Sequence, residues 1–449
     1  MDCAEFIRAA GRVRPNENQL RFMRETPFYV FVHFSPNTFT DLEWGTGKES
    51  PGVFAPTDLD CDQWARAIKS AGATGMVLTA KHHDGFCLWP SKQTEHSVKN
   101  SPYRNGKGDI VREASEACRR HGLKFGFYLS PWDRNAKCYG TPEYNDFYRA
   151  QLTELLTGYG EIFYVWFDGA CGEGPGGRKQ VYEFESYIEL IRKYQPKAVF
   201  FNDAGEIRWC GNESGATGAS QWSVVPGELC FLNKEVQTGP GPLAGYGTPR
   251  GMYNSDPEIG ALETDLYSKG LVFSPAETDM SIRPGWFWHP NEEPHSLDRL
   301  FDTYLRTVGG NTTFNLNVPP DRRGRFDGRD VKRLAELGER VRDAFANEIP
   351  AIKTKISDPR YPDQPTFRME FQNTRRVRYV TLEEHIENGQ RVSSFALYVN
   401  SHGEMRKEYP GTTIGSRRIV PLDAETDALE IRIRSSRAEV EDLIIRAYA

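Results

Sequence analysis

The sequence predicts an α/β fold: a (β/α)8-type TIM-like barrel over residues 1–347, followed by a C-terminal antiparallel β-sandwich over residues 348–449. Short apolar runs alternate with amphipathic helical segments through most of the chain, which is typical of a parallel α/β architecture. After Pro350 the helical period disappears and only short alternating runs remain. A doubly wound open sheet is the alternative, but no Gly-x-Gly-x-x-Gly motif follows the first predicted strand.

The predicted barrel strands are short and rich in β-branched and aromatic residues. The run beginning at Phe163 (FYVWF) is almost wholly apolar, as expected of a strand buried on both faces, and it stops at Asp168-Gly169. Gln221–Val225 is strand-like within an otherwise irregular stretch from Asp203 to about Gly270. The other predicted barrel strands cover residues 28–34, 75–81, 124–130, 198–202, 271–274 and 312–318.

The predicted helices carry recognisable start and stop signals. Asp60 caps a helix with Gln63 three residues later, as in a capping box, and Gly72 closes it. Thr141-Pro142 opens another helix, since proline is favoured at the first helical position. Further helices are expected over residues 109–121, 180–194, 296–308 and 330–345. Beyond the barrel, strands are expected at residues 367–371, 377–381, 395–399, 429–433 and 443–447.

Composition narrows the class of ligand. The formal net charge of −6 gives no basic surface for nucleic acid or for an anionic membrane, so a neutral ligand is favoured. No apolar run approaches the roughly 20 residues that a transmembrane helix needs. The sequence carries no indication of oligomeric state.

The expected compartment is the cytoplasm for the chain as written. Residues 1–5 lack the basic and apolar regions of a signal peptide, and the eight cysteines are scattered without metal-ligand spacing. An exported form from which a signal peptide has been removed is the alternative.

Several polar side chains follow predicted strands, at the edge where barrel enzymes build their active sites. They are His33, His82, His83, Tyr128 and Asp168. Each has a simpler interpretation, because histidines in apolar strands are often structural and Asp-Gly pairs often open turns. Metal chelation by His82 and His83 is disfavoured, because neighbours in a strand point to opposite faces.

A ring of His, Tyr, Glu and Trp side chains suits the hydroxyls and apolar faces of a sugar. Glycoside hydrolysis then needs two carboxyl groups, one to attack or stabilise the anomeric carbon and one to protonate the leaving oxygen. Asp168 is the first candidate. The second is expected between Asp203 and Gly270, where Glu213 lies in a glycine-rich loop beside Trp209. Three competitors are Glu206, Glu228 and Glu258, and spacing alone does not choose among them.

The motifs together resemble the α-L-fucosidases of glycoside hydrolase family 29. The resemblance covers essentially the whole chain and rests on His-Phe-Ser (33–35), Glu-Trp-Gly (43–45), Lys-His-His-Asp-Gly-Phe (81–86), Phe-Tyr (127–128) with Ser-Pro-Trp (130–132), and Trp-Phe-Asp-Gly (166–169). The Lys-His-His-Asp-Gly-Phe and Trp-Phe-Asp-Gly motifs, in that order, are highly specific together, whereas either alone would only be suggestive. Asn-Glu-x-Gly (212–215) and Ser-Ile-Arg-Pro-Gly-Trp (281–286) also resemble the branch of that family that acts on α-1,3/1,4-linked fucose.

The resemblance implies a retaining exo-α-L-fucosidase without metal or organic cofactor, acting on fucosylated oligosaccharides of the Lewis type. It implies Asp168 as the nucleophile and singles out Glu213 as the general acid/base. It also implies that fucose is held by His33, Glu43, Trp44, His82, His83, Tyr128 and Trp286. Two other readings stay open: a barrel glycosidase for another sugar such as galactose, and a catalytically inactive fucose-binding protein.

Overall fold

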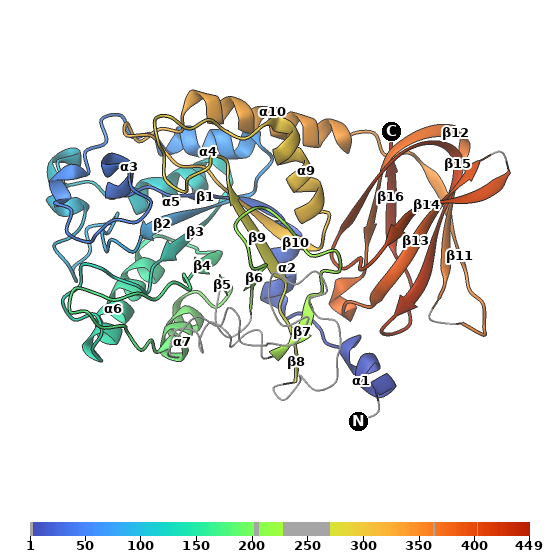
Figure 1. Ribbon diagram of the computed structural model, residues 1–449, viewed down its shortest axis with the longest axis horizontal. Coiled ribbons are helices and arrows are strands. Elements are labelled where there is room, and N and C mark those ends of the chain that lie inside the picture. Colours follow the sequence, from blue (N-terminus) through green and yellow to red (C-terminus); the bar gives the residue numbers. More distant parts are fainter. Residues whose placement is uncertain (1–2, 202–205, 228–269, 362–363, 402) are drawn as a thin grey trace.

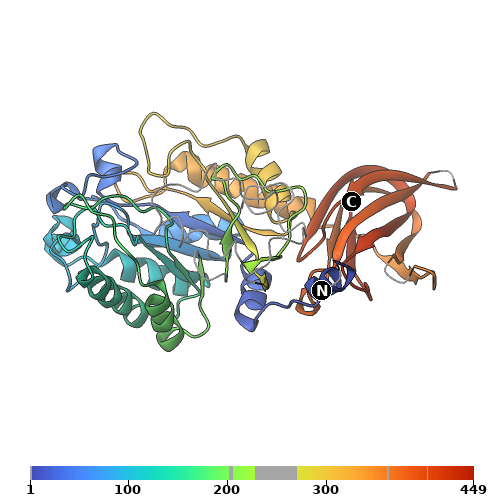
Figure 2. The ribbon, with the colours of Figure 1, turned by 60° about the horizontal axis from the view of Figure 1, so that its bottom comes forward.

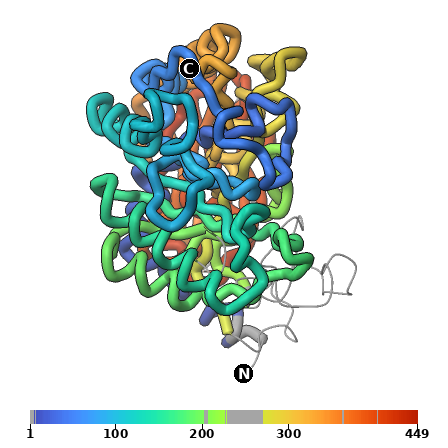
Figure 3. Tube along the Cα trace, turned by 90° about the vertical axis from the view of Figure 1, so that its left-hand side faces the viewer, coloured from blue at the N-terminus to red at the C-terminus, as the bar shows by residue number. Residues whose placement is uncertain are grey.

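The computed structural model describes residues 3–201, 206–227, 270–361, 364–401 and 403–449. The barrel and a C-terminal β domain lie side by side along the longest axis of the molecule (Figure 1). Seen from the barrel side, the C-terminal domain lies behind the barrel elements (Figure 3). Within the described residues, none of the helices combines the length and the apolar character that crossing a bilayer requires.

A parallel eight-stranded sheet forms the barrel in the described part of the chain. Its strand order is β5-β4-β3-β2-β1-β10-β9-β6, and a parallel bridge between Phe201 and Ile207 joins the two edges. The predicted fold class is therefore confirmed. The strands are β1 (Phe28–Val32), β2 (Gly75–Lys81), β3 (Lys124–Leu129), β4 (Tyr164–Trp166), β5 (Val199–Phe201), β6 (Arg208–Trp209), β9 (Ala276–Ser281) and β10 (Thr312–Asn317).

Helices cover the outside of the barrel, as the apolar stripes of their sequences require. Asp60 accepts a hydrogen bond from the backbone N–H of Gln63, but the predicted capping box is incomplete, because the Gln63 side chain pairs with the backbone of Phe326 instead. The helices are α1 (Cys3–Ala10), α2 (Glu17–Glu25), α3 (Pro36–Thr40), α4 (Cys61–Ser70), α5 (Ile110–His121), α6 (Glu143–Gly158), α7 (Phe184–Tyr194), α9 (Leu297–Thr307) and α10 (Gly328–Ala344).

Aromatic side chains fill the barrel interior. Tyr29, Phe31, Tyr164 and Trp166 belong to one buried cluster, and the Trp166 ring stacks on Phe201 with centroids 4.0 Å apart. Alternate residues of the same strands face the helices and form the larger outer core. The barrel is therefore a packed core, and its strand ends present a rigid floor for a site.

Two predicted barrel strands are wrong. Residues 221–225 and 271–274 contribute to β7 (Val224–Pro226) and β8 (Leu271–Phe273), which pair antiparallel in a separate two-stranded sheet. Their places in the barrel are taken by β6 and β9. β9 has the sequence Ala-Glu-Thr-Asp-Met-Ser, whose acidic residues hide it from a search for apolar runs.

The C-terminal domain is an antiparallel sheet of six strands in the described residues, bent around its own core (Figure 2). The predicted strands at 367–371 and 377–381 are parts of one long strand, β12, which pairs with β15 along its length and is broken by register shifts. The strands are β11 (Ala351–Ile356), β12 (Thr366–Glu383), β13 (Val392–Ser401), β14 (Glu404–Gly411), β15 (Arg418–Ser436) and β16 (Ile444–Tyr448).

Candidate active site

Asp168 lies two residues beyond β4, and both of its carboxylate oxygens are held. The Tyr128 hydroxyl donates to Oδ2 at 2.9 Å, and the Ala170 backbone N–H donates to Oδ1 at 2.7 Å. Burial and the neighbouring Asp168 charge raise the pKa of Tyr128 well above its ordinary value, so the phenol stays protonated and remains a donor. The Asp168 side chain is 23% exposed, which leaves it reachable by a ligand.

His83 presents the lone pair of its Nε2 to the same Asp168 carboxylate. Its Nδ1 lies 2.7 Å from Ser130 Oγ, and that hydroxyl donates to the Trp132 carbonyl, so Nδ1–H of His83 is the donor to Ser130. Burial lowers the pKa of His83, which keeps the ring neutral and leaves Nε2 as an acceptor. Nε2 lies 3.8 Å from Asp168 Oδ2. Two acceptors at this separation suit a donor, such as a sugar hydroxyl, between or beside them.

His33, which follows the neighbouring strand β1, is also oriented by a hydrogen bond from its Nδ1–H. Asn317 donates through Nδ2 to the Trp286 carbonyl at 2.8 Å, so its Oδ1 accepts from Nδ1–H of His33, also at 2.8 Å. Burial lowers the pKa of His33 to about 3, so the ring is neutral and its Nε2 is a second acceptor. Two neutral, oriented imidazoles can therefore accept hydrogen bonds from hydroxyl groups without titrating near neutral pH.

His82 and His83 do not point to opposite faces, so that part of the sequence argument is wrong. β2 ends at Lys81, and beyond the strand the two rings lie with centroids only 4.2 Å apart. His82 also stacks on Tyr128, and its buried Nδ1 has no hydrogen-bond partner among the residues that the structure describes. Within the described ranges, no three His, Cys, Asp or Glu side chains gather in a way that could hold a metal ion.

Glu213 reaches the cluster from the loop after β6. Its Oε2 accepts a hydrogen bond from the indole Nε1–H of Trp286 at 3.0 Å. The residue keeps solvent contact, but the partial burial of its carboxyl group and the charges of Asp168 and Glu43 raise its pKa, against the lowering effect of the Trp286 bond. A bound ligand that covers Glu213 would raise this pKa further, because burial disfavours the charged form.

The Asn-Glu-x-Gly motif explains how this loop is shaped. Asn212 Oδ1 accepts from the backbone N–H groups of Ser214 and Ala216 at 3.1 and 3.2 Å. Gly215 has a φ of +75°, and a Cβ there would collide with Met280 and Thr303. Its N–H donates to the Asp279 carbonyl at 3.2 Å, which attaches the loop to β9.

Trp44 and Glu43 form part of the rim of the cluster. Trp44 is 56% exposed and contacts His83 and Trp132 edge-on, with ring centroids 5.5 Å apart in both cases. Glu43 accepts from the backbone N–H groups of Trp286 at 2.8 Å and Phe287 at 3.1 Å. An exposed tryptophan of this kind offers an apolar platform for a ring.

The nine residues predicted from the sequence therefore lie in one connected cluster at the carboxyl ends of the barrel strands. Trp286 contacts His33 with ring centroids 5.1 Å apart, and His33 contacts His82 and Tyr128. Two carboxyl groups, neutral imidazoles and indole faces therefore lie together. Glycoside hydrolysis requires a pair of carboxyl groups of this kind.

Comparison with known proteins decides the family. The α-L-fucosidase family model matches residues 25–343. α-L-Fucosidase 1 of Arabidopsis thaliana is 38% identical over 460 aligned residues, covering 96% of this chain and 86% of the relative. The chain belongs to the α-L-fucosidase family. It is a glycoside hydrolase of family 29.

Solved structures agree with this assignment. A Bacteroides ovatus crystal structure matches with a TM-score of 0.87 and 38% identity, covering 100% of this chain and 76% of that one. A family 29 fucosidase of Ruminococcus gnavus in complex with fucose matches with a TM-score of 0.81 and 27% identity, covering 97% and 95% of the two chains.

The competing glutamates of the fucosidase chain do not share this cluster where they are described. Glu206 accepts from Asn16 on the cap of α2 and from the backbone N–H of Phe200, both at 3.2 Å, and forms an ion pair with Arg192. These contacts tie it to the wall between α2 and α7. Glu228 and Glu258 lie outside the described residues.

Sequence reasoning missed a buried carboxyl group beneath the site. Glu277 on β9 is fully buried and accepts from the hydroxyl groups of Tyr29 and Tyr164, the Trp166 indole and the Asn315 amide. Burial raises its pKa. The only signal in the sequence is an acidic residue in a segment that has to be a strand, and that segment was not recognised as one.

Lys81, at the end of β2, connects this strand to the segment after β3 and to α6. This fully buried ammonium donates to Asp133 and Gln151 at 3.0 Å each and to the Tyr144 hydroxyl at 3.3 Å. Asp84 in turn accepts from the backbone N–H of Phe86 at 2.7 Å. The outer residues of the Lys-His-His-Asp-Gly-Phe motif are therefore structural, and only its histidines face the site.

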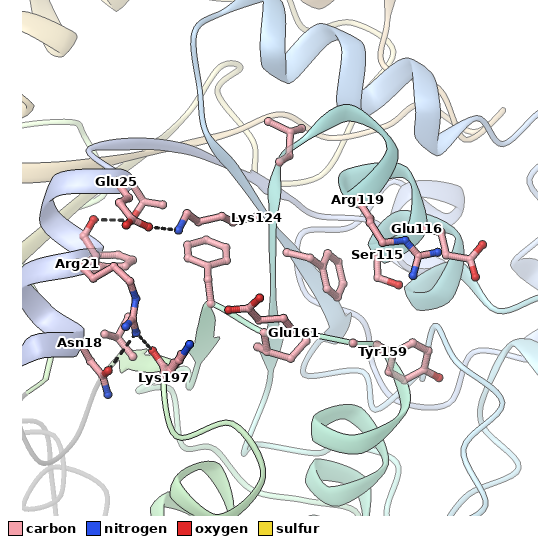
Figure 4. A pocket seen from close by; sticks show the side chains of 18 of the residues that line it. Asn18, Arg21, Glu25, Ser115, Glu116, Arg119, Lys124, Tyr159, Glu161 and Lys197 are labelled. Atoms are coloured by element: carbon pink, nitrogen blue, oxygen red, sulfur yellow. Dashed lines mark hydrogen bonds and ion pairs between the residues drawn. The ribbon is translucent and has the colours of Figure 1, made fainter.

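A charged groove of about 520 Å³ opens at the other end of the barrel, where β3, β4 and β5 begin (Figure 4). Lys124 pairs there with Glu25, and Arg21 donates to Asn18 and to the Lys197 carbonyl. The cluster around Asp168 lies at the opposite strand ends, where barrel enzymes generally build their active sites. That cluster, and not the groove, is therefore the candidate active site of this fucosidase.

Proposed function

We propose that this enzyme is a retaining exo-α-L-fucosidase in which Asp168 attacks the anomeric carbon and Glu213 acts as general acid and then as general base. In the first step the Asp168 carboxylate forms an ester with fucose, while Glu213 gives its proton to the departing sugar oxygen. In the second step Glu213 takes a proton from water, which displaces Asp168 and releases fucose with its original configuration.

The proposal rests on the difference between the surroundings of the Asp168 and Glu213 carboxyl groups. Asp168 receives two hydrogen bonds, from the Tyr128 hydroxyl and from the Ala170 backbone N–H, which fix the position of its carboxylate. Glu213 has a raised pKa, as a proton donor requires. The retaining mechanism also predicts carboxyl groups about 5 to 5.5 Å apart, in contrast to the wider spacing of inverting enzymes.

The stereochemistry of the first product tests the mechanism. Proton NMR during hydrolysis should show α-L-fucose first, followed by slow mutarotation to the anomeric mixture. Azide then assigns the residues: Glu213→Gln with azide should yield the α-fucosyl azide, and Asp168→Gly with azide should yield the β-fucosyl azide. β-Fucose as the first product would overturn the retaining mechanism.

We further propose that the natural bond is α-1,3/1,4-linked fucose on Lewis-type glycans. The proposal rests on the match of residues 212–215 and 281–286 to that branch of the family. Release of fucose from Lewis a or Lewis x trisaccharide should be much faster than from 2′-fucosyllactose. A strong preference for 2′-fucosyllactose would contradict the linkage, and turnover of galactosides alone would contradict the sugar.

A further inference from the structure

His289 bridges two carboxylates at the rim of the site. Its Nδ1 lies 2.7 Å from Asp41 Oδ1, and its Nε2 lies 2.6 Å from Glu43 Oε1. Asp41 ends α3 with a left-handed φ of +62°, so its side chain is set by a constrained turn. The imidazole thereby connects the loop after β1 to the loop after β9.

Glu43 passes this connection on to Trp286. Its two oxygens accept from His289 and from the backbone N–H groups of Trp286 and Phe287. A carboxylate has about four acceptor positions, so three of them serve the loop rather than a ligand. Gly285 completes the contact, because a Cβ there would meet Glu43 Oε1 and the His289 ring.

Trp286 is the side chain that holds Glu213. Its carbonyl accepts from Asn317, its backbone N–H donates to Glu43, and its indole N–H donates to Glu213 at 3.0 Å. The chain of contacts from Asp41 to Glu213 is therefore continuous. Hydrogen bonds and the covalent frame of Trp286 make up this chain, so it connects the position of His289 to that of the indole.

We propose that His289, acting through Glu43 and Trp286, is a positioning residue that orients Glu213 for proton transfer. The inference rests on the proposed role of Glu213. It assigns to His289 no contact with the sugar and no proton transfer of its own.

The charged groups around His289 support a doubly donating ring. Burial alone would lower its pKa, but the hydrogen bonds to Asp41 and Glu43 and the charges of Glu43 and Glu292 outweigh burial and raise it. The protonated ring donates to both carboxylates at once, whereas a neutral ring donates to one.

Leaving groups of different basicity test the proposal. A sugar alcohol needs a proton to depart, whereas the fluoride of α-L-fucosyl fluoride departs with little assistance. His289→Phe should lower kcat/KM about 10- to 100-fold on a fucosylated trisaccharide and less than about 3-fold on the fluoride. Asp41→Asn should lower kcat/KM on the two substrates with the same selectivity but to a smaller extent. It is the variant to measure if His289→Phe does not fold.

Two further variants separate this proposal from the one on which it rests. Glu213→Gln should show the same selective loss, larger in size. His295→Phe makes the same substitution outside the site, on a histidine that contacts Arg299, and should leave both substrates near wild type.

Equal loss on both substrates for His289→Phe, or no loss, with a selective loss for Glu213→Gln, would overturn only the role of His289. Equal loss on both substrates for Glu213→Gln would overturn the acid/base assignment, and this inference with it.

Discussion

The two proposed catalytic carboxyl groups are held by very different parts of the molecule. Asp168 follows barrel strand β4, and its two oxygens are fixed by Tyr128 from β3 and by the turn at Ala170. Glu213 lies on a loop whose internal hydrogen bonds centre on Asn212, and its carboxyl group receives one hydrogen bond from Trp286.

The difference separates two requirements of the reaction. A nucleophile needs a fixed position, which the strand ends of a rigid barrel provide. An acid/base group needs a pKa that changes as the sugar arrives and leaves, and a partly exposed loop allows this. The barrel thus fixes the position of Asp168, and neighbouring loops adjust the pKa of Glu213.

Removal of the Asp168 carboxylate should have the largest effect on activity. Asp168→Ala should lower kcat/KM by about 10⁴-fold or more, since loss of a nucleophile removes the covalent route. Steady-state kinetics on a fucosylated trisaccharide measure it, with circular dichroism as a check of folding. Near-normal activity in a folded variant would contradict the assignment.

The hydroxyl that orients Asp168 should matter less. Tyr128→Phe removes one hydrogen bond to a charged group, worth about 1.5–3 kcal/mol, so kcat/KM should fall roughly 10- to 100-fold. Tyr148→Phe is the matched control, because that buried hydroxyl donates to the Leu129 backbone carbonyl at 2.7 Å and not to Asp168. The control should lose about 1 kcal/mol of stability and little activity. Equal activity losses in the two variants would show that the Tyr128 bond has no special role.

The protonation of Glu213, the carboxyl group on the loop, should be visible in the pH dependence of kcat/KM. The kcat/KM for an oligosaccharide should fall as the pH rises through the raised pKa of Glu213, because only the protonated acid assists departure. The Trp286 bond lowers that pKa, so Trp286→Phe should move the basic limb to higher pH by less than about one unit. A basic limb that moves to lower pH would contradict the role given to this bond.

The smallest effect concerns stability at the rim. The pKa of His289 is raised above its ordinary 6.5, so its contribution to the free energy of unfolding is fully present below pH 6.5 and is lost as the pH rises through the raised value. The ring is only 17% exposed, but its partners Asp41 and Glu43 are 52% and 39% exposed, so screening by solvent should keep the contribution below about 1 kcal/mol. Urea unfolding of wild type and His289→Phe at pH 6 and pH 9 should show a difference that shrinks with pH. A difference that grows with pH would reverse the sign.

The apolar strands and their helices could be predicted because burial on both faces leaves a plain signal. The run before Asp168 and the capped helix after Asp60 are of this kind, and both form where expected, as β4 and α4. β9 could not be predicted by the same rule, because Glu277 is made compatible with a buried strand only by donors from Tyr29, Tyr164, Trp166 and Asn315. Those partners meet only in three dimensions.

The site follows the same division. Residues at the ends of apolar strands, such as Tyr128 and Asp168, could be proposed from position alone. Glu213 needed a family motif, since nothing in the spacing separates it from Glu206. His289 had no signal in the sequence, because its role depends on Asp41 and Glu43, almost 250 positions earlier in the chain.

The most direct test of the account is to identify the residue that carries the sugar. A 2-deoxy-2-fluoro-fucosyl fluoride should inactivate the enzyme by slowing breakdown of the covalent intermediate, and peptide mapping by mass spectrometry should find the label on Asp168. A label on another carboxylate, or turnover with no label under conditions that inactivate other retaining glycosidases, would contradict the account.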